Sequence, residues 1–292
     1  LHVSSSITEQ GQGTNAILAQ IAAGVFGVDL DRVRVTTGDT ETTPYGGGTW
    51  ASRGAGIGGE AMLQAAHALK DQVLEVAAVI LQGKAEALDI VAGKVVDATG
   101  GAERITLSDL ARTVYYRGNE LPADLEPELV ATRHYRVTDF PFVFTNGAMA
   151  AYVEVDTETG FTKILNFWAV EDCGRVINPA LVDEQIRGGV VQGIGGALYE
   201  EVIYDEDGQQ LNTSMADYLV PMAAEMPDIV VKHVETPTKT SALGAKGAGE
   251  AGTGGAPGAL MNAINDALRP MGAEVTQMPM TPQRVLRALG VV

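Results

Sequence analysis

The segment from Lys246 to Glu250 (KGAGE) places one carboxylate inside a glycine-rich run that continues to Gly258. Glycine lets the backbone approach a bulky ligand and exposes N–H groups that bind anions. A ligand bound by such a loop would contact the Glu250 carboxylate, which could then act as a general base. The segment predicts a ligand-binding loop that carries its own proton acceptor. A surface loop with a solvated glutamate explains this stretch, taken alone, equally well.

Two further stretches present groups suited to phosphate. Gln12 and Gly13 come just before a helix expected over residues 15–26, where exposed N–H groups and the helix dipole favour an anion. Ser52 and Arg53 place a hydroxyl and a guanidinium next to glycines. Taken singly, the first stretch is also explained as a tight strand-to-helix turn and the second as a helix cap.

Two matches to the GxGxxG pattern, at residues 54–59 and 247–252, raise the alternative of a nicotinamide-dependent enzyme. A dinucleotide fold needs a strand directly before the glycines and an acidic residue at the end of a second strand about 20 residues later. A loop pattern precedes Gly54, and the run ahead of Gly247 contains Pro237 and lacks a strand pattern. The GxxxxGK(S/T) pattern is also absent. The sequence therefore disfavours both kinds of nucleotide site.

The composition excludes several classes of function. A formal net charge of -17 disfavours a nucleic-acid partner, because phosphate binding needs clustered Lys and Arg. Cys173 is the only cysteine, which excludes an intrachain disulfide and any cluster held by cysteines of this chain alone. The four histidines are far apart in sequence, which disfavours a histidine-rich metal site. A membrane span needs about 18 consecutive apolar residues, and no apolar run is that long.

The start of the sequence suggests a piece of a larger domain or a split subunit. A strand pattern is already under way close to Leu1, and no charged or apolar export signal precedes it. The cytoplasm is therefore the expected compartment.

Strands and helices mix along the chain without strict alternation, which favours an α+β fold. The expected strands cover residues 3–7, 33–37, 94–97, 149–156, 163–170 and 230–235, with tight turns at 157–160 and 205–208. The expected helices cover residues 15–26, 60–81, 108–117, 179–200, 258–268 and 282–289, with Thr14 and Thr281 as N-caps. Periodicity is lost over residues 121–144, so we expect two mixed lobes, 1–145 and 146–292, the second carrying the Glu250 loop.

Most of the 35 glycines fall in four windows, residues 11–13, 46–59, 188–196 and 244–258. Each window adjoins a helix or strand pattern, whereas a flexible linker would place its glycines between domains. The windows predict several glycine-lined segments that converge on one ligand.

The order of the motifs is more specific than any single motif. They are GQGT (11–14), GTWASRG (48–54), DCGRVINP (172–179), VDEQIRGGVVQGIGGALYEE (182–201) and GAKGAGE (244–250). In this order they resemble the molybdenum hydroxylase family, which includes xanthine dehydrogenase, aldehyde oxidoreductase and aerobic carbon monoxide dehydrogenase. The resemblance runs from about Val3 to Leu289 and is to the C-terminal, second molybdopterin-binding domain of the large subunit.

The resemblance also implies the site. Glu250 falls where the family places its catalytic glutamate, as the base that takes a proton from a water-derived hydroxide attacking an electrophilic carbon. The residues implied to contact the cofactor are Gln12, Gly13, Thr49, Ala51, Ser52, Arg53, Cys173, Gln185, Lys246, Gly247 and Gly249. The cofactor would be molybdopterin, in its cytosine dinucleotide form, and its pterin dithiolene would hold the molybdenum without a protein ligand.

The expected function is therefore that of a molybdenum-cofactor-binding subunit, or fragment, of a hydroxylating dehydrogenase acting on an aldehyde or N-heteroaromatic substrate. The expected partners are a chain supplying the first molybdenum-binding domain, an iron–sulfur (2Fe-2S) subunit and an FAD subunit. A noncatalytic structural or assembly subunit is the alternative from another class, and a nicotinamide-dependent oxidoreductase is the third possibility.

Overall fold

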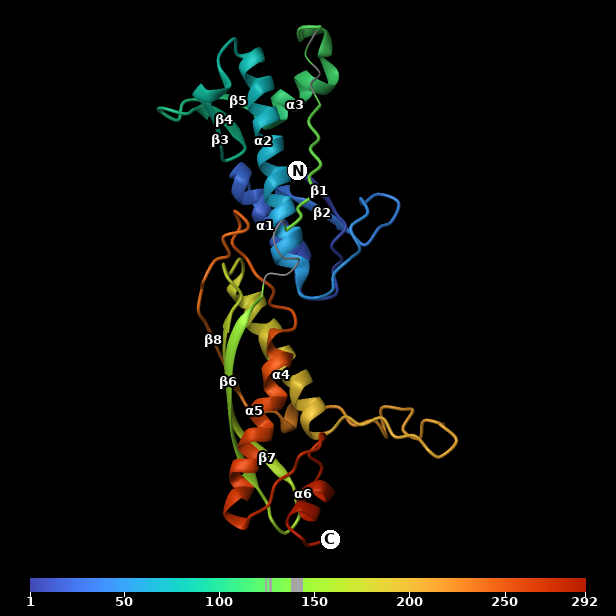
Figure 1. Cartoon of the computed structure of the whole chain (residues 1–292). Coiled ribbons are helices and arrows are strands. Elements are labelled where there is room, and N and C mark those ends of the chain that lie inside the picture. The colour runs from blue at the N-terminus through green and yellow to red at the C-terminus, as the bar shows by residue number, and fades with distance from the viewer. Residues whose placement is uncertain (124, 126–127, 138–143) are drawn as a thin grey trace. The chain divides into compact units, whose positions relative to one another are not determined.

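The computed structural model describes residues 1–123, 125, 128–137 and 144–292, and Figure 1 shows its elements. The chain divides into two compact units. The first unit comprises Leu1–Phe142 and Lys239–Ala245, and the second comprises Val143–Thr238 and Lys246–Val292. The lobes expected from the sequence lack this return of residues 239–245 to the first unit. Residues 124, 126–127 and 138–143 of the expected boundary lie outside the described residues.

The described residues of the first unit form two small sheets and three α-helices. Its elements are β1 (His2–Ser5), α1 (Thr14–Phe26), β2 (Arg34–Thr37), α2 (Glu60–Ile80), β3 (Leu88–Val91), β4 (Lys94–Asp97), β5 (Glu103–Thr106) and α3 (Leu107–Tyr116). Strand β1 pairs in parallel with β2, whereas β3, β4 and β5 form an antiparallel sheet. Apolar side chains from α1, α2, α3 and the second sheet form one core, which includes Phe26, Val95 and Leu110.

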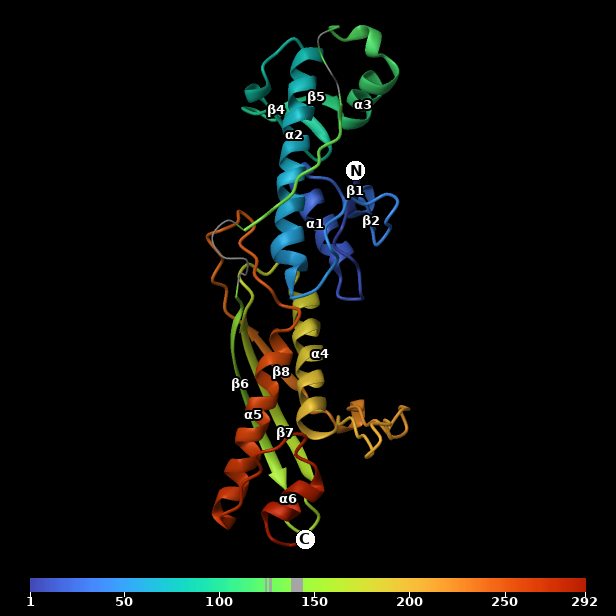
Figure 2. The same ribbon diagram turned by 45° about the vertical axis from the view of Figure 1, so that its right-hand side comes forward.

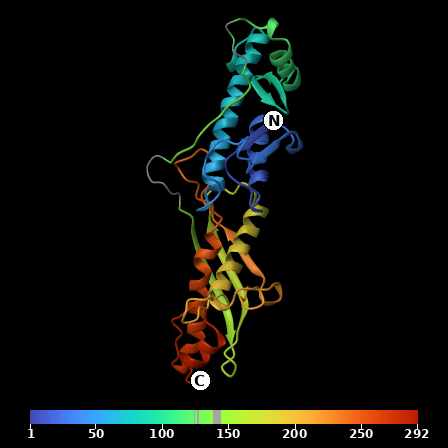
Figure 3. The same ribbon diagram turned by 90° about the vertical axis from the view of Figure 1, so that its right-hand side faces the viewer.

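The second unit is a three-stranded sheet with two long helices over one face (Figure 2). Its elements are β6 (Asn146–Val155), β7 (Thr162–Asp172), α4 (Pro179–Leu198), β8 (Ile229–His233), α5 (Ala251–Leu268) and α6 (Pro282–Ala288). Strand β7 lies between β6, its antiparallel neighbour, and β8, its parallel neighbour. The β6–β7 turn and the C-terminal helix lie at the same end of the second unit (Figure 3). Gly160, in this turn, packs against Pro282 at the start of α6.

Helices α4 and α5 pack closely because glycines face one another. A Cβ atom added at Gly189 would lie 3.0 Å from the Cα atom of Gly252, and one added at Gly252 would overlap the carbonyl oxygen of Ile186. The prediction that the 188–196 window is a ligand-lining segment is therefore wrong at Gly189 and Gly193. These glycines lie inside α4, and their lack of side chains lets two helix backbones approach.

The α+β class is confirmed, and most expected helices and strands are present with ends shifted by a few residues. One helix prediction is wrong at its start. Helix α5 begins at Ala251 rather than near Gly258, so Pro257 lies inside the helix. The cap prediction at Thr14 is also wrong: Gly13, in the left-handed conformation, caps α1, and Thr14 is its first residue.

Several short elements are not predicted by the sequence. Strands β3 and β5 were not expected, nor was the π-helical turn Gly54–Gly59 that leads into α2. Thr281 caps α6 as expected, with its hydroxyl accepting the Arg284 N–H. Among the described residues, no helix has the length and apolar character needed to cross a membrane.

Candidate functional site

In the first unit, two predicted cofactor-binding segments meet at one carbonyl group. The Nε2 atom of Gln12 donates to the carbonyl oxygen of Thr8 at 3.1 Å, and the hydroxyl of Thr49 donates to the same oxygen at 2.8 Å. Gln12 also donates to the Thr14 hydroxyl at 2.8 Å. The loop before α1 and the loop before α2 are therefore joined, although they are far apart in sequence.

The N–H groups at the start of α1 already have an anion, which is the carboxylate of Glu9. This carboxylate accepts from the N–H groups of Gly11 (2.8 Å), Gly13 (3.0 Å) and Asn15 (2.9 Å). Burial by itself raises the pKa of Glu9, but these hydrogen bonds outweigh it and lower the pKa. The structure thus places an internal carboxylate where the sequence predicted a phosphate seat. The signal that was missed is an acidic residue a few positions before a glycine-capped helix.

The loop before α2 has a backbone conformation that is costly for its residues. Ala51 and Ser52 have φ values of 49° and 55°, in the left-handed region that only glycine adopts freely. Such residues cost about 1–3 kcal/mol each and cluster at ligand-binding sites. The guanidinium of Arg53 lies 5.3 Å from the centre of the Trp50 ring, which holds its charge beside this loop. The π-helical turn that follows is also typical of functional sites.

In the second unit, the Glu250 loop is tied to helix α4 and to the end of β7. The Nε2 atom of Gln185 donates to the carbonyl oxygen of Gly249 at 2.7 Å. The N–H of Lys246 donates to the carbonyl oxygen of Cys173, also at 2.7 Å. Three predicted site segments, around Cys173, Gln185 and Glu250, are therefore brought together here.

Glu250 is the residue directly before α5 and is exposed to solvent in the described chain. Its carboxylate therefore lies at the positive end of the α5 helix dipole. An accessible carboxylate can act as a general base.

The ammonium group of Lys246 pairs with a carboxylate that the sequence analysis did not single out. Its Nζ atom lies 3.1 Å from Oδ2 of Asp172, and the two side chains are only 9% and 13% exposed. The Oδ1 atom of Asp172 accepts from the N–H groups of Gly174 and Thr236, both at 3.0 Å. Burial alone raises the pKa of Asp172, but these hydrogen bonds and the ammonium outweigh it and hold the pKa well below its ordinary range.

Cys173 is buried, and burial raises the pKa of its thiol. A thiol that resists ionisation does not serve as a nucleophile. Burial therefore argues against a nucleophilic role for Cys173.

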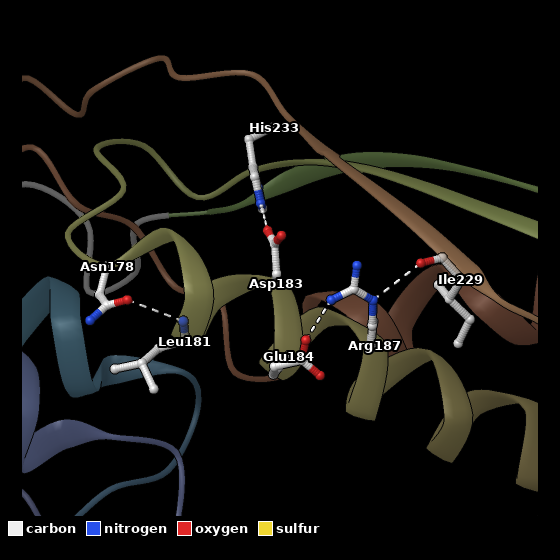
Figure 4. A network of polar contacts seen from close by, with 7 residues as sticks. All are labelled: Asn178, Leu181, Asp183, Glu184, Arg187, Ile229 and His233. Atoms are coloured by element: carbon white, nitrogen blue, oxygen red, sulfur yellow. Dashed lines mark hydrogen bonds and ion pairs between the residues drawn. The ribbon is translucent and has the colours of Figure 1, made fainter. Parts of the chain in front are cut away.

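A second polar network anchors the start of α4 to β8 (Figure 4). The Nε2 atom of His233 lies 2.5 Å from Oδ1 of Asp183, and Arg187 donates to the carbonyl oxygen of Ile229 at 3.2 Å. Next to His233 in the sheet register, Glu171 is buried, with its carboxyl group against Gly147. Burial raises the pKa of Glu171 to about 7, and the nearby His233 opposes this shift.

The predicted site residues therefore form two groups, each inside one unit. The first unit gathers Gln12, Gly13, Thr49 and residues 51–53. The second unit gathers Cys173, Gln185 and residues 246–250.

The donor chemistry of both groups fits a molybdopterin cofactor. A pterin dinucleotide whose dithiolene holds the metal needs amide, hydroxyl and backbone polar groups, and both groups of residues supply these. The strained backbone at Ala51 and Ser52 is the observation that favours a ligand. Among the described residues, no three His, Cys, Asp or Glu side chains form a group that could hold a metal ion directly.

The GxGxxG matches lack the surroundings of a dinucleotide site. Residues Gly54–Gly59 form the π-helical turn, and the strand that precedes Gly247 in sequence, β8, ends at His233. Neither match has the strand directly before it that the dinucleotide fold requires.

Comparison with known proteins gives one consistent result. Residues 1–227 match the family model described as a molybdopterin cofactor-binding domain. The chain is 41% identical to the nicotine 6-hydroxylase large subunit of Paenarthrobacter nicotinovorans, covering 98% of this chain and 35% of that protein. It is 33% identical to the carbon monoxide dehydrogenase large chain of Hydrogenophaga pseudoflava, covering 96% and 34%.

A solved structure agrees with these sequence matches. The crystal structure of quinoline 2-oxidoreductase from Pseudomonas putida 86 superposes with a TM-score of 0.91 at 39% identity, covering 99% of this chain and 36% of that one. The chain thus spans about a third of the length of the curated relatives it matches. The resemblance drawn from the motif order is confirmed. The chain belongs to the molybdopterin cofactor-binding domain family of the molybdenum-dependent oxidoreductases.

Proposed function

We propose that this chain is the cofactor-binding part of the catalytic subunit of a multi-subunit hydroxylating dehydrogenase. The reaction would insert water-derived oxygen at an electrophilic carbon of an aldehyde or N-heteroaromatic substrate. Nicotine and quinoline, which appear in the names of two relatives, are both N-heteroaromatic compounds and favour the second class.

One observation carries the proposal. The loop that ends in Glu250 is hydrogen-bonded to Gln185 and to the backbone of Cys173, so the one candidate base lies among the residues expected to contact the cofactor. Glu250 directly precedes α5, so its carboxylate lies at the positive end of the helix dipole. A site that had lost turnover would gain nothing from keeping an acid at that position.

The molybdenum cofactor, when bound, supplies two-electron redox chemistry that protein side chains lack. Gln185 would orient the loop from the α4 side, and the backbones of Gly247 and Gly249 allow close approach of the cofactor. Glu250 would accept a proton from the attacking water-derived oxygen, which lowers the barrier for attack on carbon.

The remaining parts of the enzyme would lie on other polypeptide segments. With a single cysteine, this chain cannot itself hold a 2Fe-2S cluster, so we infer that iron–sulfur and FAD subunits carry the electrons away. The relatives are described as a large subunit and a large chain, which supports an assembly of several subunits. The cytosine dinucleotide form of the cofactor and the cytoplasmic location stay predictions.

The variant Glu250→Gln in the assembled enzyme tests the proposal. We expect turnover to fall on the order of 10²–10⁴-fold, because the amide cannot accept the proton. The molybdenum content should stay within twofold, because the amide keeps the shape of the side chain. Glu274→Gln, at an exposed glutamate of the same unit, is the matched control and should leave turnover unchanged.

Near-normal turnover in Glu250→Gln would remove Glu250 from this role and favour a noncatalytic subunit. Loss of the metal together with turnover would instead assign Glu250 to cofactor binding.

A further inference from the structure

The acid at the end of β7, Asp172, joins three separate segments of the second unit. Its Oδ1 atom accepts from the N–H of Gly174, in the turn after β7, and from that of Thr236, after β8. Its Oδ2 atom pairs with Nζ of Lys246, the first residue of the Glu250 loop. Each of these contacts comes from a different stretch of backbone, so the carboxylate fixes where those stretches meet.

Lys246 is held at both ends. Its backbone N–H donates to the carbonyl oxygen of Cys173, and its ammonium group pairs with the residue before Cys173. The Lys246 side chain is 9% exposed, and the carboxylate of Asp172 neutralises its charge. This arrangement differs from a lysine that extends its charge toward the phosphates of a cofactor.

The other end of the loop is fixed as well. Gln185 donates to the carbonyl oxygen of Gly249, and helix α5 begins directly after Glu250. Only Gly247 and Ala248 separate the two anchored ends of the loop. A shift at Lys246 would therefore be transmitted to Glu250 through a very short stretch of chain.

We propose that Asp172 and Lys246 are positioning residues, and that their buried ion pair sets the location of the Glu250 carboxylate relative to the turn around Cys173. This inference rests on the proposed function of Glu250. It assigns the Lys246 ammonium to Asp172, whereas the family resemblance implied Lys246 as a cofactor contact, and it gives a role to Asp172. Removing either charge leaves the other one buried without compensation, so the loop would rearrange to expose it.

The experiment compares Asp172→Asn, Lys246→Met and the double variant in the assembled holoenzyme. Each single variant should lower kcat per bound molybdenum by roughly 10- to 100-fold, because a misplacement of about 1 Å has an effect of this order. The KM and the molybdenum content should stay within twofold. The double variant should be no slower than the slower single variant, since the two residues act as one pair. Lys163→Met, at an exposed lysine of β7, is the matched control and should behave as wild type.

Three outcomes would overturn the proposal. If Asp172→Asn has a normal kcat per molybdenum, the pair does not position the base. If only the thermal stability and the cofactor content fall, the pair is structural. If Lys246→Met loses the cofactor while Asp172→Asn keeps it, the lysine binds the cofactor directly. Glu250→Gln is measured in parallel. If the proposed function is wrong, Glu250→Gln will remain active. If only the positioning role is wrong, Glu250→Gln will still lose turnover.

Discussion

Glu171 and Asp172 are adjacent in sequence and lie in opposite environments. Asp172 accepts two backbone N–H groups and pairs with an ammonium, so it remains ionised. Glu171 is 2% exposed and lies against Gly147, where burial raises its pKa to about 7. Successive residues of a strand point to opposite faces, so Glu171 is buried whereas Asp172 meets the two N–H groups and the ammonium. This difference in surroundings shifts the two pKa values in opposite directions.

This difference predicts how stability depends on pH. Below about pH 4.5, Glu171 is protonated in both the folded and the unfolded chain, and its burial costs no ionisation energy. As the pH rises from about 4.5 to about 7, the unfolded chain releases its proton first, so the folded state loses stability until the folded pKa is passed. Glu171→Gln removes this loss and should be more stable than wild type by about 1–3 kcal/mol at pH 8, with no gain at pH 4.5.

Chemical unfolding measured across this pH range checks the prediction. Glu154→Gln, on the exposed face of the same sheet, is the control and should follow the wild-type curve. Parallel curves for wild type and Glu171→Gln would show that Glu171 titrates normally.

At the scale of elements, the packing of α4 against α5 fixes the start of α5 and therefore the end of the loop that carries Glu250. Gly189, Gly193 and Gly252 let the two helices pack closely, and the loop that carries Glu250 runs directly into α5. The Thr253 hydroxyl adds a hydrogen bond across the contact, to the carbonyl oxygen of Gly189 at 3.0 Å. This packing uses glycines that the sequence analysis had assigned to a ligand site.

A pair of alanine substitutions in one helix tests this packing. Gly252→Ala should destabilise the protein by about 1–3 kcal/mol, because the added methyl group overlaps the backbone of α4. Gly254→Ala, two residues later, meets no atom within 4 Å and should stabilise by up to about 1 kcal/mol through helix propensity. Thermal denaturation of both variants gives the comparison, and equal melting temperatures would contradict the close contact.

At the scale of the whole molecule, the chain spans about a third of the length of its curated relatives and contains a single cysteine. Its predicted cofactor contacts are divided between two compact units. A complete enzyme of the proposed kind needs an iron–sulfur cluster, and the single cysteine of this chain cannot hold one by itself.

Metal analysis and absorbance spectroscopy test whether the cofactors are distributed among several subunits in this way. The chain purified together with its partner subunits should contain molybdenum, with flavin and iron–sulfur absorbance in the same particle. The chain expressed alone should contain molybdenum far below one equivalent, because the remaining cofactor contacts would be missing. Tight, stoichiometric molybdenum in the chain alone would contradict the proposed assembly.

The sequence by itself determined what depends on local pattern and motif order. Helices α2 and α4 lie where the sequence predicted helices over residues 60–81 and 179–200, and Thr281 caps α6 as predicted. The order of the glycine-rich motifs identified the family, and the catalytic role of Glu250 stays a prediction of that resemblance. These features are local because caps, periodicity and motifs involve residues a few positions apart.

Only the tertiary structure decided how distant residues are used. Asp172 has no distinctive local pattern, and its role comes from the Thr236 N–H and the Lys246 ammonium, which the fold brings to it from distant parts of the sequence. The glycines of α4 and α5 look like ligand-loop glycines in sequence, because a missing side chain serves close helix packing and close ligand approach equally well. Lys246 likewise has a side chain suited to a phosphate or to a carboxylate, and burial next to Asp172 decided which charge it neutralises.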